Sequence, residues 1–564
     1  MRTIYISVNV VLVASVLLFI FSFAYLDRTN HKTYLYIINS GGRDIGMIKI
    51  DRYRTEEKTL YKAVGDTPLD ASAAQSRSEI IYDNKFGLES FDSEDTANRV
   101  TDSYSIAIRD GLASYLSRRG SGFQTVSGIS VKKDAIILKQ DSILTYLPLI
   151  EGYDFRRTVP QGFNTLVIFS KGLPPVRRFS SMICTKDEYV KIPAGPQPQR
   201  RGARKIRTFA LALKTRDFPQ SLIWVARSDR SIVKIEIPQL GIRITRTFYP
   251  KTFEAKPFMV KEEGYVSRNA SFKSKNAQLE GTLTVPSGGT KMPAVLLAGG
   301  RGRDDRDCRG LFSSIADFLS KNGYCVLRFD RRGVGKSGGA MAGSALSDNL
   351  EDLNAAIECL AGQKEVDADR IGVIGQQEGA YYAMKAAAEN SAIKSIILVA
   401  PLMYGQTDAY SPEEIIKYAA GNLKLGDEYA RLVMRSMDES LKIAADSRET
   451  AAILGKKVHL KDFRERMSEK PTEVAQSIKA PVLILQGKEE NDASVKFAPI
   501  IDKALTGSGN IKHALKYFGY LGPYFGKGIS NGIYITYYEA DKEVLANIKD
   551  WLDTTLPLPV TTLS

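Results

Sequence analysis

The sequence predicts an α/β protein: an apolar N-terminal helix, a β-rich antiparallel part, and a doubly wound, mostly parallel sheet with a helical insertion. Two changes of pattern along the 564 residues support this division. Residues 31–265 alternate apolar and polar side chains in short runs, which is typical of antiparallel strands. From residue 266 to 564, continuous apolar runs alternate with helical segments. That pattern is typical of parallel strands buried on both faces.

The first 30 residues are expected to form a transmembrane helix that acts as a signal anchor. Thr3 to Leu26 is an uncharged run of 24 residues, and roughly 20 apolar residues are enough to cross a bilayer. A cleaved signal peptide is the alternative, because Ser22-Phe23-Ala24 resembles a cleavage site. The run is longer than the roughly 7–15 residues of a signal-peptide core, so we favour a retained anchor. The rest of the chain is then expected outside the cytoplasm, periplasmic or at the cell surface in a bacterium.

The β-rich part, residues 31–265, contains one segment in which we expect a helix, Asp102–Arg118. Its apolar positions are Ile106, Ile108, Leu112 and Leu116. The other runs are rich in β-branched and aromatic residues and are expected to be strands. They are Thr33–Ile38, Ile129–Leu138, Thr165–Phe169, Thr208–Leu213, Leu222–Ala226 and Ile232–Ile237. We find no catalytic set of residues in this part.

Positive charge is concentrated in the same part of the chain. Of the net charge of +14, residues 151–250 contribute +12, with 19 Lys and Arg against 7 Asp and Glu. The densest run contains Arg200, Arg201, Arg204 and Lys205. Such a patch could contact anionic lipid headgroups near the anchor or an acidic ligand, and a solvated loop without a partner is equally consistent. Nucleic acid is not an expected partner of an exported chain.

Residues 266–564 are expected to form the parallel sheet and its helices. The expected strands are Ala294–Ala298, Tyr324–Phe329, Arg370–Ile374, Ser395–Val399, Pro481–Leu485 and Ala514–Phe518. The expected helices are Leu311–Leu319, Leu350–Leu360, Glu378–Ala388 and Tyr537–Leu552. Residues from about 402 to 479 interrupt this alternation and are expected to form a helix-rich cap that covers the edge of the sheet.

The segment Gly375-Gln376-Gln377-Glu378-Gly379 lies between an expected strand and an expected helix. This is the setting of the G-x-S-x-G motif, in which a sharp turn presents a nucleophilic serine. The glycines at 375 and 379 suit the turn, but the central residue is Gln377. Its amide nitrogen is delocalised, and it has no ionisable hydroxyl or thiol. Gln377 therefore occupies the position of a nucleophile without being one.

Three further motifs occur in the order found in one known family. They are Leu296–Gly300 followed by Asp305-Arg306-Asp307, the D-x-R-G-x-G-x-S-like loop Phe329–Gly339, and the strand Pro481–Gly487. Together with the turn Gly375–Gly379, which we call the elbow, these motifs resemble the α/β-hydrolase superfamily, of the dienelactone hydrolase and serine aminopeptidase-like kind. The resemblance covers residues from about 270 to 555. The resemblance implies the α/β-hydrolase fold and an oxyanion loop at Gly299 and Gly300.

The resemblance also implies a serine, histidine and carboxylate triad. It gives the acid position to Glu490, with Glu489 and Asp492 as alternatives, and the histidine position to Pro523 in Leu521-Gly522-Pro523-Tyr524-Phe525. Proline has no titratable group. The three histidines, His31, His459 and His513, are poorly placed to replace it. The nucleophile and the base are both missing from their expected positions.

These observations predict a catalytically degenerate hydrolase that binds an ester, acyl or peptide-like ligand. Its pocket would use Gln377, the backbone N–H groups near Gly299, Gly300 and Glu378, and aromatic walls. The expected wall residues are Tyr381, Tyr520, Tyr524 and Phe525. One alternative is an active hydrolase in which Glu378 or Glu490 activates water. Another is a module that binds anionic lipid or polymer through the basic patch.

No metal or cofactor is expected. Asp304, Asp305 and Asp307 lie close together in the sequence, but no histidine accompanies them, so loop-bracing ion pairs are the preferred interpretation. Cys184, Cys308, Cys325 and Cys359 lack metal-type spacing and are expected to be free thiols. Cys308 lies near the expected pocket but has no histidine partner to activate it.

Overall fold

The computed structural model describes residues 31–559 with internal gaps. The gaps are 41–42, 68–73, 84–86, 140–141, 169–173, 193–202, 217, 250–260, 301, 303, 404–413, 415, 418–420, 422–425, 489–492, 523 and 531–534. The expected transmembrane segment Thr3–Leu26 lies outside these residues. Among the residues that are described, no helix is both long and apolar enough to span a membrane.

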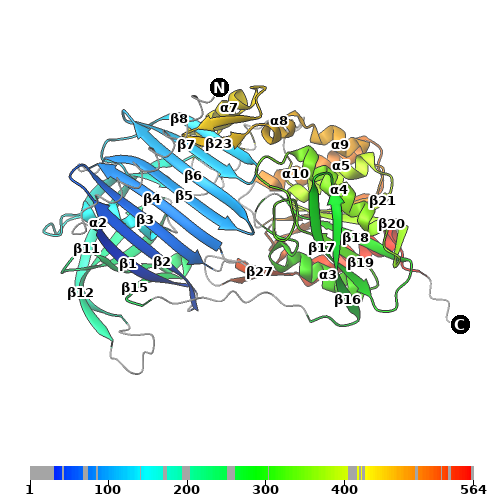
Figure 1. The fold of residues 1–564 in the computed structure, drawn as a ribbon, viewed down its shortest axis with the longest axis horizontal. Helices are drawn as coiled ribbons and strands as arrows, with labels where there is room; N and C mark the ends of the chain where they lie inside the picture. Colours follow the sequence, from blue (N-terminus) through cyan, green and yellow to red (C-terminus); the bar gives the residue numbers. More distant parts are fainter. Residues whose placement is uncertain are drawn as a thin grey trace, which may run out of the picture.

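Residues 31–247 form one sheet of fifteen strands, drawn in blue to green in Figure 1. The strands are β1 (His31–Ser40), β2 (Arg43–Arg54), β3 (Lys58–Thr67), β4 (Ala74–Asp83), β5 (Leu88–Ala97), β6 (Val100–Arg109), β7 (Leu112–Arg119), β8 (Gly122–Ser130), β9 (Ile136–Lys139), β10 (Gln161–Ile168), β11 (Val176–Ile192), β12 (Arg204–Thr215), β13 (Phe218–Ala226), β14 (Ile232–Ile237) and β15 (Ile242–Thr247). Their order is β8-β7-β6-β5-β4-β3-β2-β1-β15-β14-β13-β12-β11-β10-β9. Only β9 and β10 pair in parallel, so the expected antiparallel, β-rich architecture is present.

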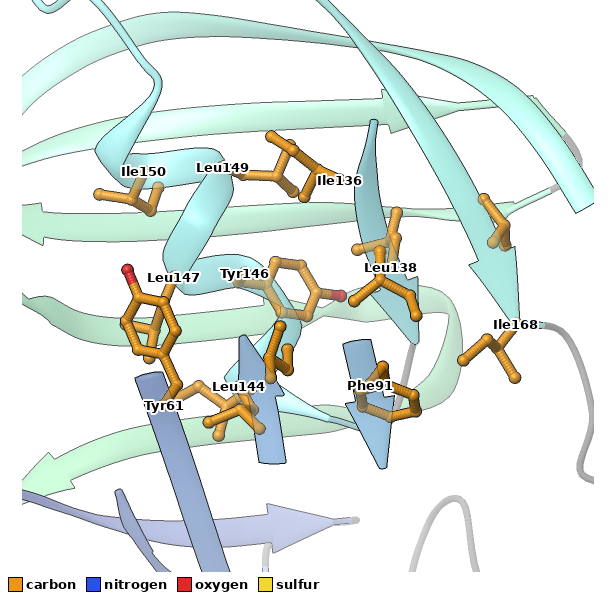
Figure 2. Close-up of a cluster of buried hydrophobic side chains, with 14 of the residues drawn as sticks. Tyr61, Phe91, Ile136, Leu138, Leu144, Tyr146, Leu147, Leu149, Ile150 and Ile168 are labelled. Carbon is orange, nitrogen blue, oxygen red and sulfur yellow. The ribbon is translucent and has the colours of Figure 1, made fainter. Parts of the chain in front are cut away.

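The sheet curves around a short helical segment formed by η2 (Ile143–Tyr146) and α2 (Leu147–Glu151). Figure 2 shows Tyr146, Leu147 and neighbouring apolar side chains of this segment among side chains of the strands. Strands distant in the sheet meet here, since Ile137 N on β9 donates to the Tyr82 hydroxyl on β4 at 3.2 Å. Burial of this apolar cluster stabilises the curvature, at about 25 cal/mol per Å² of apolar surface.

The helix expected at Asp102–Arg118 is a β-hairpin instead, formed by β6 and β7. Its two-residue turn is Asp110-Gly111, with φ values of 51° and 73°. Positive φ at both positions is the requirement of the tight hairpin turn for which Asp-Gly is preferred. The expected strand Ile129–Leu138 is also corrected, because β8 ends at Ser130 and β9 begins at Ile136.

Residues 265–518 contribute a second sheet of eight strands, in the order β16-β17-β19-β18-β20-β21-β24-β25. The strands are β16 (Tyr265–Ser274), β17 (Ala277–Pro286), β18 (Met292–Ala298), β19 (Cys325–Phe329), β20 (Val366–Gln376), β21 (Ile393–Val399), β24 (Val482–Gly487) and β25 (His513–Phe518). From β19 to β25 all neighbours are parallel, whereas β16 and β17 are antiparallel additions at one edge. The expected mostly parallel sheet is confirmed.

Helices cover both faces of this sheet. One apolar cluster includes α4 (Leu346–Ala361), α5 (Glu378–Glu389), α9 (Pro471–Ser477) and α10 (Phe497–Gly507), and the other includes η4 (Cys308–Gly310), α3 (Leu311–Lys321) and α11 (Lys542–Thr555). The helix expected from Tyr537 begins only at Lys542, because Ile535–Ala540 is strand β27, paired with β26 (Gly526–Ser530). A remaining short turn, η5 (Ala493–Lys496), precedes α10.

The insertion between β21 and β24 contains α7 (Gly426–Ala444), the hairpin β22 (Thr450–Ile453) and β23 (Lys456–His459), and α8 (Lys461–Ser468). The hairpin was not expected. The helix α7 lies over β8 of the fifteen-stranded sheet (Figure 1). The expectation that the whole cap covers the edge of the parallel sheet is therefore wrong for α7.

Side chains of α7 complete the exposed edge of β8. Thr125 N donates to Ser440 Oγ at 3.0 Å, and Ser436 Oγ donates to Thr125 O at 2.9 Å. Two residues along the strand, Ser127 N donates to Glu439 Oε2 at 2.9 Å, and Arg435 Nη2 donates to Ser127 O at 2.9 Å. Unpaired backbone groups at a sheet edge invite pairing with another chain. Here a helix provides the partners that a sixteenth strand would have provided.

Candidate functional site: a hydrolase elbow with glutamine at its apex

The turn between β20 and α5 has the backbone of a nucleophile elbow. Gln377 at its apex adopts φ 51° and ψ −116°, a conformation that costs a non-glycine residue of order 1–3 kcal/mol. The turn is held by its neighbours, because Gln377 N donates to Val399 O at 2.8 Å and Leu402 N donates to Gln377 O at 3.1 Å. The sharp turn is therefore present although its central residue is not a nucleophile.

The two glycines of the motif are required by close backbone contacts. A Cβ at Gly375 would lie 2.3 Å from Gly379 O, and a Cβ at Gly379 would lie 2.0 Å from Ala298 O. The loop after β18 also approaches the turn, since a Cβ at Gly300 would lie 3.2 Å from Glu378 N. The expected oxyanion loop and the backbone N–H after the apex are therefore neighbours, as an oxyanion hole requires.

Glu378 points away from water and into an ion-pair network. Its buried carboxylate pairs with Arg466 on α8. The Nε of Arg466 also lies 2.8 Å from Asp462 Oδ1, and Ser121 Oγ of the fifteen-stranded sheet donates to Asp462 Oδ2 at 2.8 Å. Sequence reasoning missed Arg466 and Asp462, because nothing in the cap's amphipathic pattern indicates which charges are buried. The pairing leaves Glu378 poorly suited to activate water.

Tyr381 does not form a wall beside Gln377. It is fully buried in the core under α5, and its hydroxyl donates to Glu469 Oε2 at 2.5 Å. Lys385 Nζ lies 2.8 Å from the same carboxylate. This expected pocket residue therefore joins α5 to the end of the cap.

The three aromatic residues of the segment after β25 have different environments. Phe525 is buried and packs edge-on against Phe518, whereas Tyr520 is 52% exposed. Tyr524 reaches the loop after β18, where its hydroxyl donates to Asp304 Oδ2 at 3.2 Å. Of the four expected wall residues, only Tyr524 contacts a loop that flanks the elbow.

The expected acid and histidine positions, Glu490 and Pro523, lie outside the described residues, as do Glu489 and Asp492. The strands that lead to them can be placed. β24 and β25 run parallel to β20 and β21, so they end at the edge of the sheet where Gln377 lies.

The described histidines lie elsewhere. His513 begins β25, at the opposite end of the sheet from Gln377, and its Nε2 lies 3.3 Å from Asp502 Oδ1. His459 is on β23 in the cap, and His31 is on β1. All three have partners or positions away from the elbow.

The acidic residues after β18 form ion pairs, as expected. Arg309 Nε lies 2.8 Å from Asp304 Oδ1, and Arg328 Nε lies 2.7 Å from Asp307 Oδ1. Burial, with a smaller contribution from Asp307, raises the pKa of Asp305 to about 6. No group of His, Cys, Asp and Glu suited to a metal ion occurs among the residues that the structure describes.

The loop after β19 has a structural role. Asp330 is buried and pairs with Arg306 at 2.7 Å, and Ser337 Oγ accepts a hydrogen bond from Glu280 N at 2.9 Å. Arg332 forms a two-point contact with Asp352, at 2.6 and 2.8 Å. These bonds tie the D-x-R-G-x-G-x-S loop to the loop after β18, to β17 and to α4. The Ser337 hydroxyl itself donates to Asp330 O at 2.5 Å.

The four cysteines are free thiols. Cys308 is buried, and its Sγ lies 3.7 Å from Gln376 Oε1. Burial raises the pKa of its thiol well above the usual value, which keeps it protonated and unreactive. In the basic patch, Arg204 and Lys205 are exposed residues at the start of β12, whereas Arg200 and Arg201 fall outside the described residues.

The part of the chain that contains the elbow is similar to a known protein family. The profile of the family described as serine aminopeptidase, S33 matches residues 295–500, which include β18, the elbow and β24. This part of the chain belongs to the α/β-hydrolase superfamily. Gln377 lies within this match, in the turn after β20 at the C-terminal edge of the parallel sheet.

The curated proteins to which this part of the chain is similar include one esterase. Esterase EstD of Thermotoga maritima is 27% identical over 308 residues, which are 50% of this chain and 68% of that protein. An uncharacterised Pseudomonas aeruginosa protein is 33% identical over 125 residues, 22% of this chain and 32% of the relative. Among solved structures, a Pyrococcus furiosus esterase shares 19% identity, with a TM-score of 0.34, over 53% of this chain and 96% of its own.

Proposed function

We propose that the α/β-hydrolase part of this chain binds an ester or acyl ligand, or a peptide-like one, at the elbow without hydrolysing it. The observation that carries the proposal is Gln377 at the apex, in the strained conformation φ 51° and ψ −116°. A glutamine amide can donate and accept hydrogen bonds, but it cannot form an acyl-enzyme. The ligand would be held and released unchanged.

The turn offers donors for the carbonyl of such a ligand. The N–H of Glu378 lies beside Gly300, where a carbonyl oxygen would be received. The esterase activity named for Esterase EstD favours an ester or acyl ligand over a peptide. The Gln377 side chain would add a hydrogen bond that a serine hydroxyl is too short to make.

The rival function, hydrolysis by a carboxylate-activated water, has less support. Glu378 is paired with Arg466 and buried, which removes one of its two candidates. Glu490 is the remaining candidate, and it requires an attacking water without the covalent intermediate typical of this fold.

The uncharged run Thr3–Leu26 supports the further proposal that the chain is anchored in a membrane with its remainder outside the cytoplasm. An alkaline phosphatase fusion at the C-terminus, expressed in a bacterium, tests this location. Activity of the fusion is expected, and an inactive fusion would contradict the proposed orientation.

The pseudo-hydrolase proposal is tested with a fluorophosphonate probe and with p-nitrophenyl butyrate on the full chain in phosphatidylcholine nanodiscs. We expect no labelling and turnover equal to that of buffer. The double variant Gln377→Ser/Pro523→His is expected to gain labelling. The matched control Gln376→Ser/Pro523→His, with serine one position from the apex, is not. Stoichiometric labelling of the wild type, or turnover abolished by Glu490→Gln, would overturn the proposal.

Binding gives a second measurement. Calorimetric titration with p-nitrophenyl butyrate is expected to show saturable binding that Gln377→Ala weakens about fivefold, as for the loss of a hydrogen bond worth about 1 kcal/mol. No saturable binding by the wild type would leave the elbow without the proposed ligand.

A further inference from the structure

We propose that an open groove between α7 and strands from both ends of the fifteen-stranded sheet binds a single-chain anionic amphiphile, such as a fatty acid. The groove has a volume of about 1060 Å³ and is lined by β8, β10, β11 and α7. Ligand pockets in proteins measure roughly 300–1,000 Å³, so this groove is large enough for an acyl chain. It uses none of the residues of the elbow, and the two proposals are independent.

The groove is strongly basic. Six cationic side chains and one acidic side chain line it: Lys132, Arg177, Arg178, Arg216, Arg431 and Arg435, with Glu428. The pair between Arg177 and Glu428, at 3.1 Å, is largely exposed, and such pairs contribute little. Among the described residues, Lys132 and Arg431 have no ion-pair partner. Arg435 pairs with Glu439 at 3.7 Å. An anionic head group would be attracted by the excess of positive charge that remains around Lys132 and Arg431.

Apolar side chains lie beside the cations. Ile129, Val131 and Leu166 bring the main core of the sheet to the floor of the groove. Phe179 on β11 is 64% exposed. Its ring lies against Gly162, since a Cβ there would be 2.2 Å from the ring. A small inorganic anion would leave this surface in water, whereas an acyl chain would cover it.

The groove exists before any ligand binds, because α7 is fixed to the sheet. Tyr429 OH donates to Pro174 O at 2.9 Å, and Leu432 packs against both the main core and the small cluster that contains Tyr429 and Val176. The bonds from α7 to β8 hold the rest of the helix. A preformed site loses less conformational entropy on binding than one that must close.

The groove also differs from the basic run predicted from the sequence. Arg204 and Lys205 lie on β12 and do not line it. This placement provides a matched control, because the same change of charge can be made inside and outside the groove of one protein.

The test measures palmitate binding to the full chain in phosphatidylcholine nanodiscs, by displacement of a fluorescent fatty acid. Glycerol monopalmitate, which is neutral, and inorganic phosphate, which has no chain, are the comparison ligands. We expect palmitate to bind at least tenfold more tightly than either. Equal affinity for monopalmitate would remove the role of the cations, and equal affinity for phosphate would reduce the groove to a small-anion site; either result overturns the proposal.

Three variants locate the site. Lys132→Glu/Arg431→Glu is expected to weaken palmitate binding at least tenfold, and Arg204→Glu/Lys205→Glu is expected to leave it unchanged. Ser130→Trp fills the groove without changing its charge and is also expected to weaken binding at least tenfold. All the substituted positions are exposed, and circular dichroism checks that each variant is folded. Similar affinities for the two charge-reversed pairs, or an unaffected Ser130→Trp, would show that palmitate binds elsewhere.

Discussion

The buried carboxylate of Glu378, next to the apex of the elbow, forms an ion pair with Arg466 of the cap. Through Asp462, the same arginine is connected to Ser121 of the fifteen-stranded sheet. One guanidinium therefore links the elbow, the cap and the β-rich part.

Replacing this arginine is expected to destabilise the protein strongly. Arg466→Leu leaves Glu378 and Asp462 buried without their cation, and breaking a buried pair costs about 3–5 kcal/mol. Urea unfolding monitored by tryptophan fluorescence measures the change. The control is Lys321→Ala, which removes the partly exposed pair with Asp317 and is expected to cost less than about 1 kcal/mol. If the two variants lowered the free energy of unfolding equally, the ion pairs of Arg466 would not have the stabilising role expected of them.

The strained backbone at Gln377 predicts a substitution that stabilises the protein. Gln377→Gly relieves the backbone conformation φ 51°, ψ −116° and is expected to raise the free energy of unfolding by about 1 kcal/mol. Gly379→Ala places a methyl group 2.0 Å from Ala298 O and is expected to lower it by about 1–3 kcal/mol. Thermal unfolding of both variants provides the check, and a destabilised Gln377→Gly would argue that the glutamine side chain stabilises the turn.

Asp305 gives a pH-dependent prediction. Burial raises its pKa from 3.8 to about 6 in the folded protein, so the folded state binds the proton more tightly than the unfolded state does. Ionisation of Asp305 therefore lowers stability as pH rises from about 4 to 6, and the loss stays constant above that range.

Asp305→Asn removes this titration while keeping an oxygen that can accept the hydrogen bond from Asp307 N. The variant is expected to match the wild type near pH 4 and to be more stable by about 2 kcal/mol at pH 7. The difference in unfolding free energy between the two proteins, measured from pH 4 to 8, isolates this carboxyl from all others. A difference that does not change with pH would disprove the raised pKa.

The contact between α7 and β8 can be tested at one hydroxyl. Ser440→Ala removes the acceptor of Thr125 N and leaves a buried backbone donor without a partner, which costs about 1–3 kcal/mol. Ser477→Ala, at an exposed serine that bonds within its own helix, is the control and is expected to be near neutral. Protection of the Thr125 amide from hydrogen exchange should fall in the first variant only.

The parallel sheet could be predicted because the sequence patterns that specify it each lie within a short stretch of the chain. The apolar run that ends at Ile374, the glycines at 375 and 379, and the helix that follows specify strand, turn and helix within a short stretch. The hairpin of β6 and β7 was missed although its Asp110-Gly111 turn is a known signal, because the apolar residues on either side were assigned to one helical period. In a short segment, the apolar pattern of a helix is hard to distinguish from that of a strand.

The partners of Glu378 and Tyr381 could not be predicted for a different reason. Arg466 and Glu469 are far away in the sequence, and only the packing of the cap brings them under α5. A pattern of apolar positions indicates which face of a helix is buried. It does not indicate which charged side chains form ion pairs or hydrogen bonds with another element. For the same reason the basic groove at α7 has no signature in the chain.

The edge of the fifteen-stranded sheet is completed by a serine that lies 315 residues further along the chain. During synthesis, β8 leaves the ribosome long before α7 does, so for that interval the sheet offers an open row of backbone donors and acceptors. A chain truncated before the cap keeps all fifteen strands but not the helix that closes them, and it is expected to self-associate through β8. The β-rich part thus depends on α7, which lies in the insertion of the hydrolase part, to cover the β8 edge of its sheet.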